Sequence, residues 1–480
     1  MKHNALFFAK FHVGTTSMSS VLLIIFLLIT LSVTIHAQEN QSQDNPFGIV
    51  EGFWFPEMTC ELGVGWERII FNWAQHQPES SDDWYTLNVD DRWLTAADAC
   101  DREVVALLKH TPAWATDGTE GVGVPRGLDL PIDDPGNVWA NFVRRAVDYY
   151  ASRGVFHFII WNEPDIDSST YGYEFEGDLD DYFQMVKVAY LVAEETNPAA
   201  EIHLAGTTYW HDVNEGREPY MTRLVDRILT DPDAPAHNYY FDVLSLHIYF
   251  RTDSVYDIVS EMRDMLDSRG LTEHRIWINE TNAAPTIDPD WMVERPVFNL
   301  DLQDQSNFLV QSSVLGLAAG AERIAAYKLY DQQLPPGGES FGILSPPDAS
   351  PRPAFYTWQM INEQFNNVES AQFAQTDDVD VVQLSHSNHQ QSIVAWSRTE
   401  NIATIEIAAT DDKAYLLDAY GNITLLRPEN GTYTLSLRPA TCEEGEGCFL
   451  GGAVAILVQF DNQTTIRDLT NDEPITLDFN

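Results

Sequence analysis

Short apolar runs alternate with longer amphipathic stretches between residues 46 and 365. The runs are rich in β-branched and aromatic residues, as buried strands are, and the stretches between them repeat apolar positions at helical spacing. Because strands that alternate with helices form parallel sheets, this pattern favours an α/β fold. The predicted strands span residues 47–55, 66–73, 103–111, 155–163, 201–209, 242–250, 275–281 and 323–331.

Eight strand–helix units of roughly 40 residues each predict a (β/α)8 barrel, the TIM barrel, over residues 46–365. Two of the helical patterns end at Gly154 and Gly270, where a helix C-cap favours glycine. In such a barrel the active site lies at the C-terminal ends of the strands. The polar residues that close the apolar runs are therefore the candidate site residues.

The pattern changes after residue 365 to short alternating strands separated by turn residues. It predicts an antiparallel β-sandwich of seven or eight strands over residues 366–460. Residues 461–480 show no clear core partner and are interpreted as a tail.

The N-terminus carries Lys2 and Lys10, then an apolar segment over residues 21–35 and a small residue, Ala37. This order is typical of a signal peptide over residues 1–37, here followed by a linker over 38–45. We therefore expect a secreted or extracytoplasmic protein. The alternative is an anchor formed by an uncleaved signal segment, and no other segment is long and apolar enough to cross a membrane.

Acidic residues dominate the charge, with 73 Asp and Glu against 27 Lys and Arg and a net charge of −46. Such a chain repels nucleic-acid phosphates and anionic membrane surfaces, so neither is expected as a partner. The 13 Trp, 19 Tyr and 24 Phe supply many flat apolar rings, which suit the C–H faces of sugars, although most rings are expected in the core.

Four cysteines in an exported chain permit disulfides. Cys442 and Cys448 flank an acidic loop and could close a short hairpin, whereas Cys60 and Cys100 would have to meet across two helices. No histidine lies at zinc-finger spacing from either pair, so no metal site is expected.

Two glutamates close predicted strands: Glu163 in "FIIWNEPDI" and Glu280 in "WINET". Period-two alternation would place Glu163 on one face with Ile159 and Trp161, and Glu280 with Ile276 and Ile278. Glycosidic bonds are cut by such carboxylate pairs, one as proton donor and the other as nucleophile or base. The pair therefore predicts glycoside hydrolysis at the mouth of the barrel.

These motifs, with an arginine on the second strand and a His-x-Tyr on the sixth, resemble clan A glycoside hydrolases. Segments such as "ELGVGWERIIFNW" and "LLKHTPAWA" look most like family 39 and its relatives, with family 5 next. The resemblance implies a retaining enzyme without cofactors that acts on an oligo- or polysaccharide. It also implies a role for each matching residue: Glu163 as acid/base, Glu280 as nucleophile, Asn162 on the sugar 2-hydroxyl, Arg68 keeping Glu280 ionised, Tyr249 bonded to Glu280, and His247 nearby.

The eighth strand departs from the clan's pattern, which places a tryptophan under the sugar. Here it reads "AAYKLYD", so Tyr327 or Tyr330 would replace that platform. Lys328 could favour an acidic sugar, or it could pair with Asp331 or Glu280. In "KHTPAWA", His110 and Trp114 are expected to line the pocket.

The sequence thus predicts a secreted retaining β-glycosidase of the β-xylosidase, β-glucosidase or endoglycanase type. One alternative is a catalytically idle barrel that only binds carbohydrate. Another is an inverting enzyme, in which the carboxyl groups lie about 6.5–9.5 Å apart instead of about 5–5.5 Å. The pattern leaves open the sugar, the linkage and exo or endo cleavage.

Overall fold

The computed structural model describes residues 45–170, 172–460 and 464–477. The expected signal peptide, and all of the expected linker except Asn45, lie outside these residues. Within the described ranges, no helix combines the length and the apolar character that a membrane span requires.

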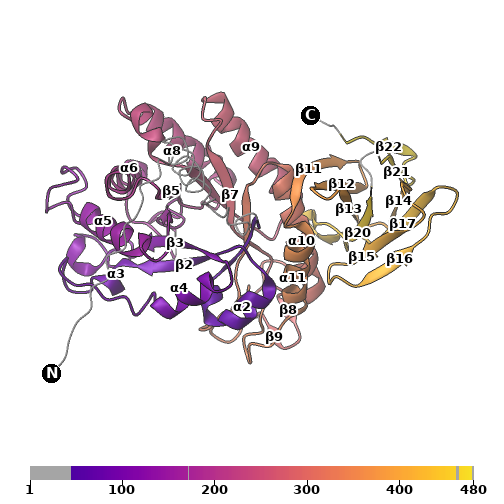
Figure 1. Ribbon diagram of the computed structural model, residues 1–480, viewed down its shortest axis with the longest axis horizontal. Helices are drawn as coiled ribbons and strands as arrows, with labels where there is room; N and C mark the ends of the chain where they lie inside the picture. Colours follow the sequence, from indigo (N-terminus) through magenta and orange to yellow (C-terminus); the bar gives the residue numbers. More distant parts are fainter. Residues whose placement is uncertain (1–44, 171, 461–463, 478–480) are drawn as a thin grey trace, which may run out of the picture. The chain divides into compact units, whose positions relative to one another are not determined.

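Eight parallel strands close into a barrel in the order β1-β10-β7-β6-β5-β4-β3-β2, which confirms the predicted (β/α)8 fold (Figure 1). Each predicted strand range overlaps one barrel strand, and only β7 extends beyond its range, by one residue. The strands are β1 (Phe47–Val50), β2 (Trp66–Asn72), β3 (Glu103–Lys109), β4 (His157–Ile160), β5 (Glu201–Leu204), β6 (Val243–Tyr249), β7 (Arg275–Asn282) and β10 (Arg323–Ala326).

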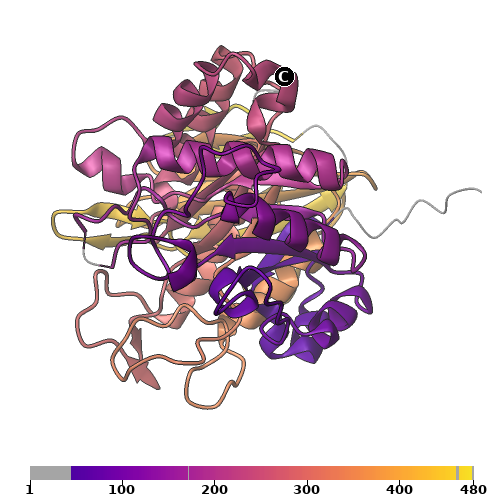
Figure 2. The ribbon, with the colours of Figure 1, turned by 90° about the vertical axis from the view of Figure 1, so that its left-hand side faces the viewer.

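Helices lie around the barrel strands (Figures 1 and 2). Two of the longer ones, α6 and α10, begin with a capping box, in which Asp178 and Asp301 accept backbone hydrogen bonds of the first turn. The helices are α2 (Pro56–Leu62), α3 (Trp73–His76), α4 (Asp91–Asp98), α5 (Val138–Ala151), α6 (Leu179–Thr196), α7 (Trp210–Asn214), α8 (Tyr220–Leu229), α9 (Val255–Ser268), α10 (Leu302–Ala318) and α11 (Pro353–Phe365). A short hairpin, β8 (Ile287–Asp288) and β9 (Trp291–Met292), lies between β7 and α10.

The barrel has two apolar cores. The larger one packs the outward faces of the strands against the helices, as α5 does with Trp139, Phe142 and Val143. The smaller one fills the barrel interior with side chains from strands all around it, among them Trp66 and Trp277. A filled interior leaves the C-terminal mouth as the place where polar side chains can meet.

A partly buried ion network closes the opposite, N-terminal end of the barrel. The buried His157, at the start of β4, lies 3.0 Å from Glu103 and 3.1 Å from Glu201. Arg323 approaches Glu103 at 2.5 Å and Arg275 approaches Glu201 at 2.6 Å. Each charge thus has an opposite charge beside it, which offsets the cost of its partial desolvation.

Beyond α11 the chain forms a six-stranded antiparallel sheet, ordered β11-β12-β13-β20-β15-β16, and a four-stranded sheet, β17-β14-β21-β22. The antiparallel sandwich is confirmed: eight strands of these two sheets lie within residues 366–460, in agreement with the seven or eight expected, and two more follow. The strands are β11 (Val368–Gln375), β12 (Val379–His386), β13 (Gln390–Ser397), β14 (Ala403–Ala408), β15 (Ala414–Leu417), β16 (Ile423–Leu426), β17 (Thr432–Leu437), β20 (Ala455–Phe460), β21 (Ile466–Asp468) and β22 (Glu473–Ile475).

The last two strands correct the interpretation of residues 461–480 as a tail without a core partner. β21 pairs with β14 and β22 pairs with β21, and Ile466, Ile475 and Leu477 are buried in the core of the sandwich. Their apolar positions are too few and too widely spaced to predict strands, because each strand is only three residues long.

Both disulfides that the sequence permits are formed. Cys60 in α2 joins Cys100, so this bond connects α2 to the turn that follows α4. Cys442 joins Cys448 across the hairpin of β18 (Thr441–Glu443) and β19 (Gly447–Leu450).

The network at the N-terminal end predicts how stability depends on acid. Burial alone would raise the pKa of Glu103 and of Glu201. His157 and Arg323 instead lower the pKa of Glu103 to about 2, and His157 and Arg275 lower that of Glu201 to about 2. The unfolded carboxyls protonate near pH 4.5, so this contribution to stability is present above pH 4.5 and is lost as the pH falls toward 2. In Glu103→Gln we expect a lower free energy of unfolding at pH 6, by on the order of 2 kcal/mol, and a shallower decline in acid.

Urea unfolding between pH 2.5 and 6 measures this decline. Glu273→Gln, which makes the same change on an exposed residue, serves as the control and should match the parent. Equal declines in Glu103→Gln and the parent would contradict the interpretation.

Candidate active site

Glu280 lies near the end of β7 and is held by three side chains, one from β2 across the barrel and two from the adjacent strand β6. Arg68 of β2 and Tyr249 of β6 each donate a hydrogen bond to one of its two carboxylate oxygens. His247 of β6 places Nδ1 3.5 Å from Oε2. Glu280 is 5% exposed and Arg68 is 2% exposed, so the pair is shielded from solvent.

A β-bulge, and not simple alternation, brings Glu280 into the barrel. Ile276 and Ile278 pack outward against the helices, while Trp277 points into the barrel interior. The pairing of β6 with β7 then shifts, so that Leu246 pairs with Ile278 but the next residue pairs with Glu280. The extra residue, Asn279, reverses the alternation, which corrects the expectation that Glu280 shares a face with Ile276 and Ile278.

Glu163 reaches the mouth from a turn beyond β4. Trp161 has a left-handed backbone (φ 71°), and its ring turns away to pack against Phe175 at 5.5 Å. Trp161 therefore does not share a face with Ile159 and Glu163, contrary to the alternation expected from the sequence. Glu163 is itself left-handed (φ 41°), and its N–H donates to the carbonyl of Gly206 at 3.1 Å.

The two carboxylates meet at His247. Its Nδ1 lies 2.7 Å from Oε1 of Glu163, and a carboxylate oxygen from each glutamate and a ring nitrogen of His247 all lie within 4.8 Å of one another. One oxygen of each carboxylate thus lies close enough to the other to act on the same glycosidic bond, as in retaining glycosidases, whose carboxyl groups lie roughly 5–5.5 Å apart.

The surroundings set the charge of the site. Burial alone would raise the pKa of Glu280, but Arg68, His247 and Tyr249 hold it below its ordinary value. Burial alone would lower the pKa of His247, but Glu280 and Glu163 raise it above its ordinary value. Glu280 is thus kept ionised beside a histidine that favours its protonated form.

Glu163, His247 and Glu280 could by distance offer three ligand atoms to a metal ion. Both oxygens of Glu280 already accept hydrogen bonds, and one of them touches the Arg68 guanidinium. A permanent positive charge in contact with a ligand disfavours a bound cation, so this donor set does not fit a metal.

Aromatic rings form one wall of the site. The Tyr327 ring lies 5.8 Å from that of Tyr249, and Phe341 lies 5.2 Å from Tyr249 and 5.9 Å from Tyr327. Asn282 holds this wall by donating to the carbonyls of Tyr327 and Phe341. Of the two candidate platforms, Tyr327 lies beside the carboxylates, whereas the Tyr330 hydroxyl donates to the carbonyl of Pro346.

Lys328 pairs with Glu51, which follows β1, at 2.5 Å. This partner is neither Asp331 nor Glu280, the two that the sequence suggested. The sequence could not show this pairing, because Glu51 follows the first strand and Lys328 follows the last. Only closure of the barrel makes these two strands neighbours.

The remaining candidates, Asn162, His110 and Trp114, lie at the same end of the barrel. Asn162 is half-buried beside Glu163. His110 follows β3, and burial, aided by the charge of Lys109, lowers its pKa to about 4. Trp114 packs against Trp73 and donates to the carbonyl of Gln77.

Two further residues shape the site and were missed in the sequence. A Cβ on Gly206 would collide with the His247 ring, so glycine is needed at the end of β5. Phe341 contributes to the wall from a long loop after β10. Neither stands at a position that strand patterns single out.

Comparisons in sequence find no relatives: no protein-family model matches the chain, and the curated proteins contain no significant match. Solved structures do match. A family 39 glycoside hydrolase from the gut symbiont Bacteroides cellulosilyticus WH2 superposes with a TM-score of 0.66 at 16% identity, over 87% of this chain and 81% of that chain.

A GH30 endoxylanase from Clostridium papyrosolvens C71 gives a TM-score of 0.56 at 13% identity, over 87% of this chain and 97% of that chain. An endo-β1,6-glucanase gives 0.56 at 11% identity, over 88% and 92%. At these identities the comparisons show the fold. The chain therefore shares its fold, a (β/α)8 barrel followed by a C-terminal β-sandwich, with these glycoside hydrolases, among them a family 39 enzyme as the resemblance implied.

Proposed function

We propose that this protein is a secreted glycoside hydrolase that cleaves a β-linked glycan with retention of configuration. The observation that carries the proposal is the pair of carboxylates within 4.8 Å, one of them in contact with a buried arginine. An idle sugar-binding barrel would need neither the close spacing nor the ionised member of the pair.

Glu280 acts as the nucleophile. Its carboxylate attacks the anomeric carbon while Glu163 donates a proton to the departing glycosidic oxygen, giving a covalent glycosyl–Glu280 ester and the free leaving group. Glu163, now ionised, takes a proton from water as the water attacks the same carbon. The ester bond breaks, and Glu280 returns as a carboxylate.

His247 and Tyr249 are assigned positioning roles. Nδ1 of His247 reaches Glu163 at 2.7 Å and Glu280 at 3.5 Å, so one ring fixes the distance between the two carboxylates. The Tyr249 hydroxyl orients the nucleophile from the other side. Asn162 is assigned to the sugar 2-hydroxyl and Tyr327 to the ring face of the bound sugar. His110 and Trp114 line the more distant part of the mouth.

A neutral sugar fits this site better than an acidic one. The Lys328 ammonium, which could have attracted a carboxylate, is neutralised by Glu51 at 2.5 Å. The net charge of −46 also disfavours an anionic polysaccharide. We therefore propose a xyloside, glucoside, galactoside or mannoside as the substrate, in preference to a uronide.

The first test replaces each carboxylate. Using the mature chain from Gln38 and a panel of aryl β-glycosides (xyloside, glucoside, galactoside, mannoside, glucuronide), we expect Glu280→Gln to lower kcat about 10⁴-fold or more, because the nucleophile is lost. Glu163→Gln should cost about 10²–10⁴-fold with a poor leaving group, and less with dinitrophenol, which departs without a proton.

Glu273→Gln is the matched control and should keep the activity of the parent, since this glutamate is exposed away from the site. Proton NMR of the first product should show the β-anomer. Parent-like rates in Glu280→Gln would indicate a different nucleophile, and initial formation of the α-anomer would indicate inversion.

The second test concerns Arg68. Its guanidinium helps to hold the pKa of Glu280 below the ordinary value, so the ionised, active form is lost only when the pH falls through that lowered pKa. In Arg68→Gln we expect the acidic limb of the kcat/KM profile to shift to higher pH, together with a loss of about 10²-fold or more at the optimum. An unshifted acidic limb would show that Arg68 supports the fold alone.

A further inference from the structure

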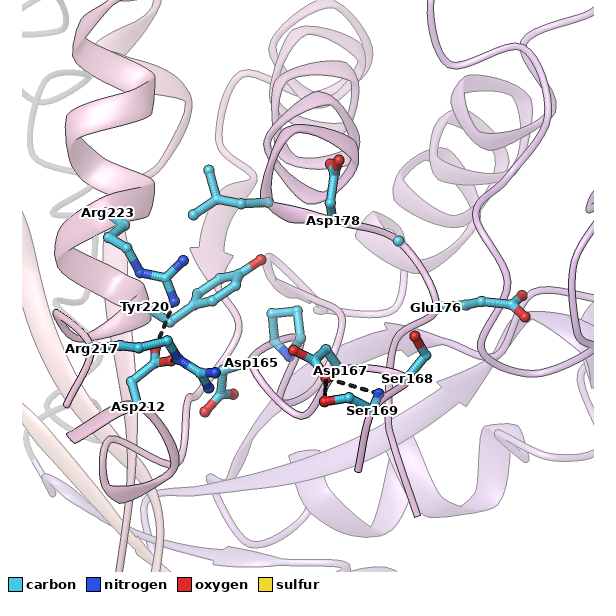
Figure 3. Close-up of a pocket in the computed structure, with 13 residues that line it drawn as sticks. Asp165, Asp167, Ser168, Ser169, Glu176, Asp178, Asp212, Arg217, Tyr220 and Arg223 are labelled. Atoms are coloured by element: carbon cyan, nitrogen blue, oxygen red, sulfur yellow. Dashed lines mark hydrogen bonds and ion pairs between the residues drawn. The ribbon is translucent and has the colours of Figure 1, made fainter. Parts of the chain in front are cut away.

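A cavity of about 510 Å³ begins at the residue that follows the proposed acid/base (Figure 3). Its lining starts at Pro164 and Asp165, the two residues after Glu163, and continues over the start of α6 and the loop and helix of α7 and α8. The volume lies within the range of about 300–1,000 Å³ that is usual for small-molecule sites.

Two buried polar atoms in this lining lack a partner. Asp165 is 4% exposed and Tyr220 is 6% exposed. Within residues 45–170, 172–460 and 464–477, no hydrogen bond reaches Oδ1 of Asp165 or the hydroxyl of Tyr220. An unsatisfied buried polar group costs about 1–3 kcal/mol, so two of them in one cavity point to a ligand that satisfies both.

The Asp165 carboxylate is fixed in place. Its other oxygen, Oδ2, accepts hydrogen bonds from the Thr208 backbone N–H at 2.9 Å and from the Thr208 hydroxyl at 2.6 Å. Oδ1 is thereby oriented without being occupied. A pre-oriented acceptor binds a hydroxyl group without a further loss of side-chain entropy.

Both arginines of this lining are held in ion pairs. Asp212 accepts from Arg217 at 2.6 Å and from Arg223 at 2.8 Å, so one carboxylate is shared by two guanidinium groups. Together with Asp165, these four residues carry no net formal charge, whereas Asp167, Glu176 and Asp178 make the lining as a whole acidic. In Figure 3 the first four lie on one side of the cavity, and Glu176 lies on the other.

This lining narrows the chemistry of the ligand. An anion would be repelled by Asp165 and by the further acids Asp167, Glu176 and Asp178, and both guanidinium groups are already paired with Asp212. A sugar hydroxyl both donates and accepts, so it can donate to Oδ1 of Asp165 and bond to the Tyr220 hydroxyl. The chemistry therefore fits a neutral sugar.

We infer that this cavity binds a neutral sugar residue of the substrate on the leaving-group side of the scissile bond. The inference rests on the proposed glycosidase activity: Glu163 protonates the leaving oxygen, so the leaving sugar lies on its side, and the cavity begins at the next residue. The enzyme is then built for oligosaccharides that extend beyond the bond being cut.

The test compares a substrate that reaches the cavity with one that does not. The aryl glycoside panel identifies the sugar, and the β-linked trisaccharide of that sugar supplies a leaving group with hydroxyls. In Tyr220→Phe we expect kcat/KM for the trisaccharide to fall about 5–10-fold, and in Asp165→Asn about 10-fold or more. Both should hydrolyse the aryl glycoside like the parent. Tyr240→Phe is the matched control, because it removes a buried tyrosine hydroxyl outside the cavity.

The outcomes separate this inference from the proposed function. Equal losses on both substrates, or no loss on the trisaccharide, would overturn the cavity assignment while the glycosidase stands. If the parent cleaves no aryl glycoside and no trisaccharide, calorimetric binding of xylotriose, cellotriose and mannotriose decides. Binding by the parent that weakens in Tyr220→Phe but not in Tyr240→Phe supports the cavity, and no binding or unchanged binding overturns it.

Discussion

Two carboxylates brought within 4.8 Å repel one another, and the site depends on how the fold offsets that repulsion. His247 lies between them, and Arg68 neutralises Glu280 from the far side. Three local features of the backbone bring these side chains together. A bulge turns Glu280 inward, a left-handed residue before Glu163 redirects the chain, and Gly206 leaves room for the histidine ring.

Local charge balance is a general feature of this strongly acidic chain. The half-buried Lys328 is matched to Glu51, and the buried Arg352 is matched to Asp288. The N-terminal end of the barrel is closed by a similar network around His157. The net charge of −46 therefore acts at the surface, whereas the mouth offers paired charges and hydroxyl-binding groups that suit neutral glycans.

The β-sandwich supports the wall of the site. It is hydrogen-bonded to the barrel where Gln311 of α10 donates to the carbonyl of Gly452 at 2.9 Å. Phe449, in the disulfide-closed hairpin, packs on Phe298 at 4.3 Å. Contacts between aromatic rings then lead through Phe250 and Phe341 to Tyr249, which bonds the proposed nucleophile. Through this chain of ring contacts, the second domain supports the packing around the site.

The sequence by itself determined the barrel, because apolar runs and helical stretches report burial locally, and it determined the sandwich from alternating short strands. It also placed Arg68, His247, Tyr249 and both glutamates at one mouth, since parallel strands end on one side. Only the tertiary structure decided which face each glutamate takes. A bulge at Asn279 and a positive φ at Trp161 leave no periodic mark in the sequence. It also decided the partners that barrel closure brings together, such as Glu51 and Lys328, and the strands too short to be recognised, such as β21 and β22. Pairing between distant segments depends on their positions in space, which a local pattern does not contain.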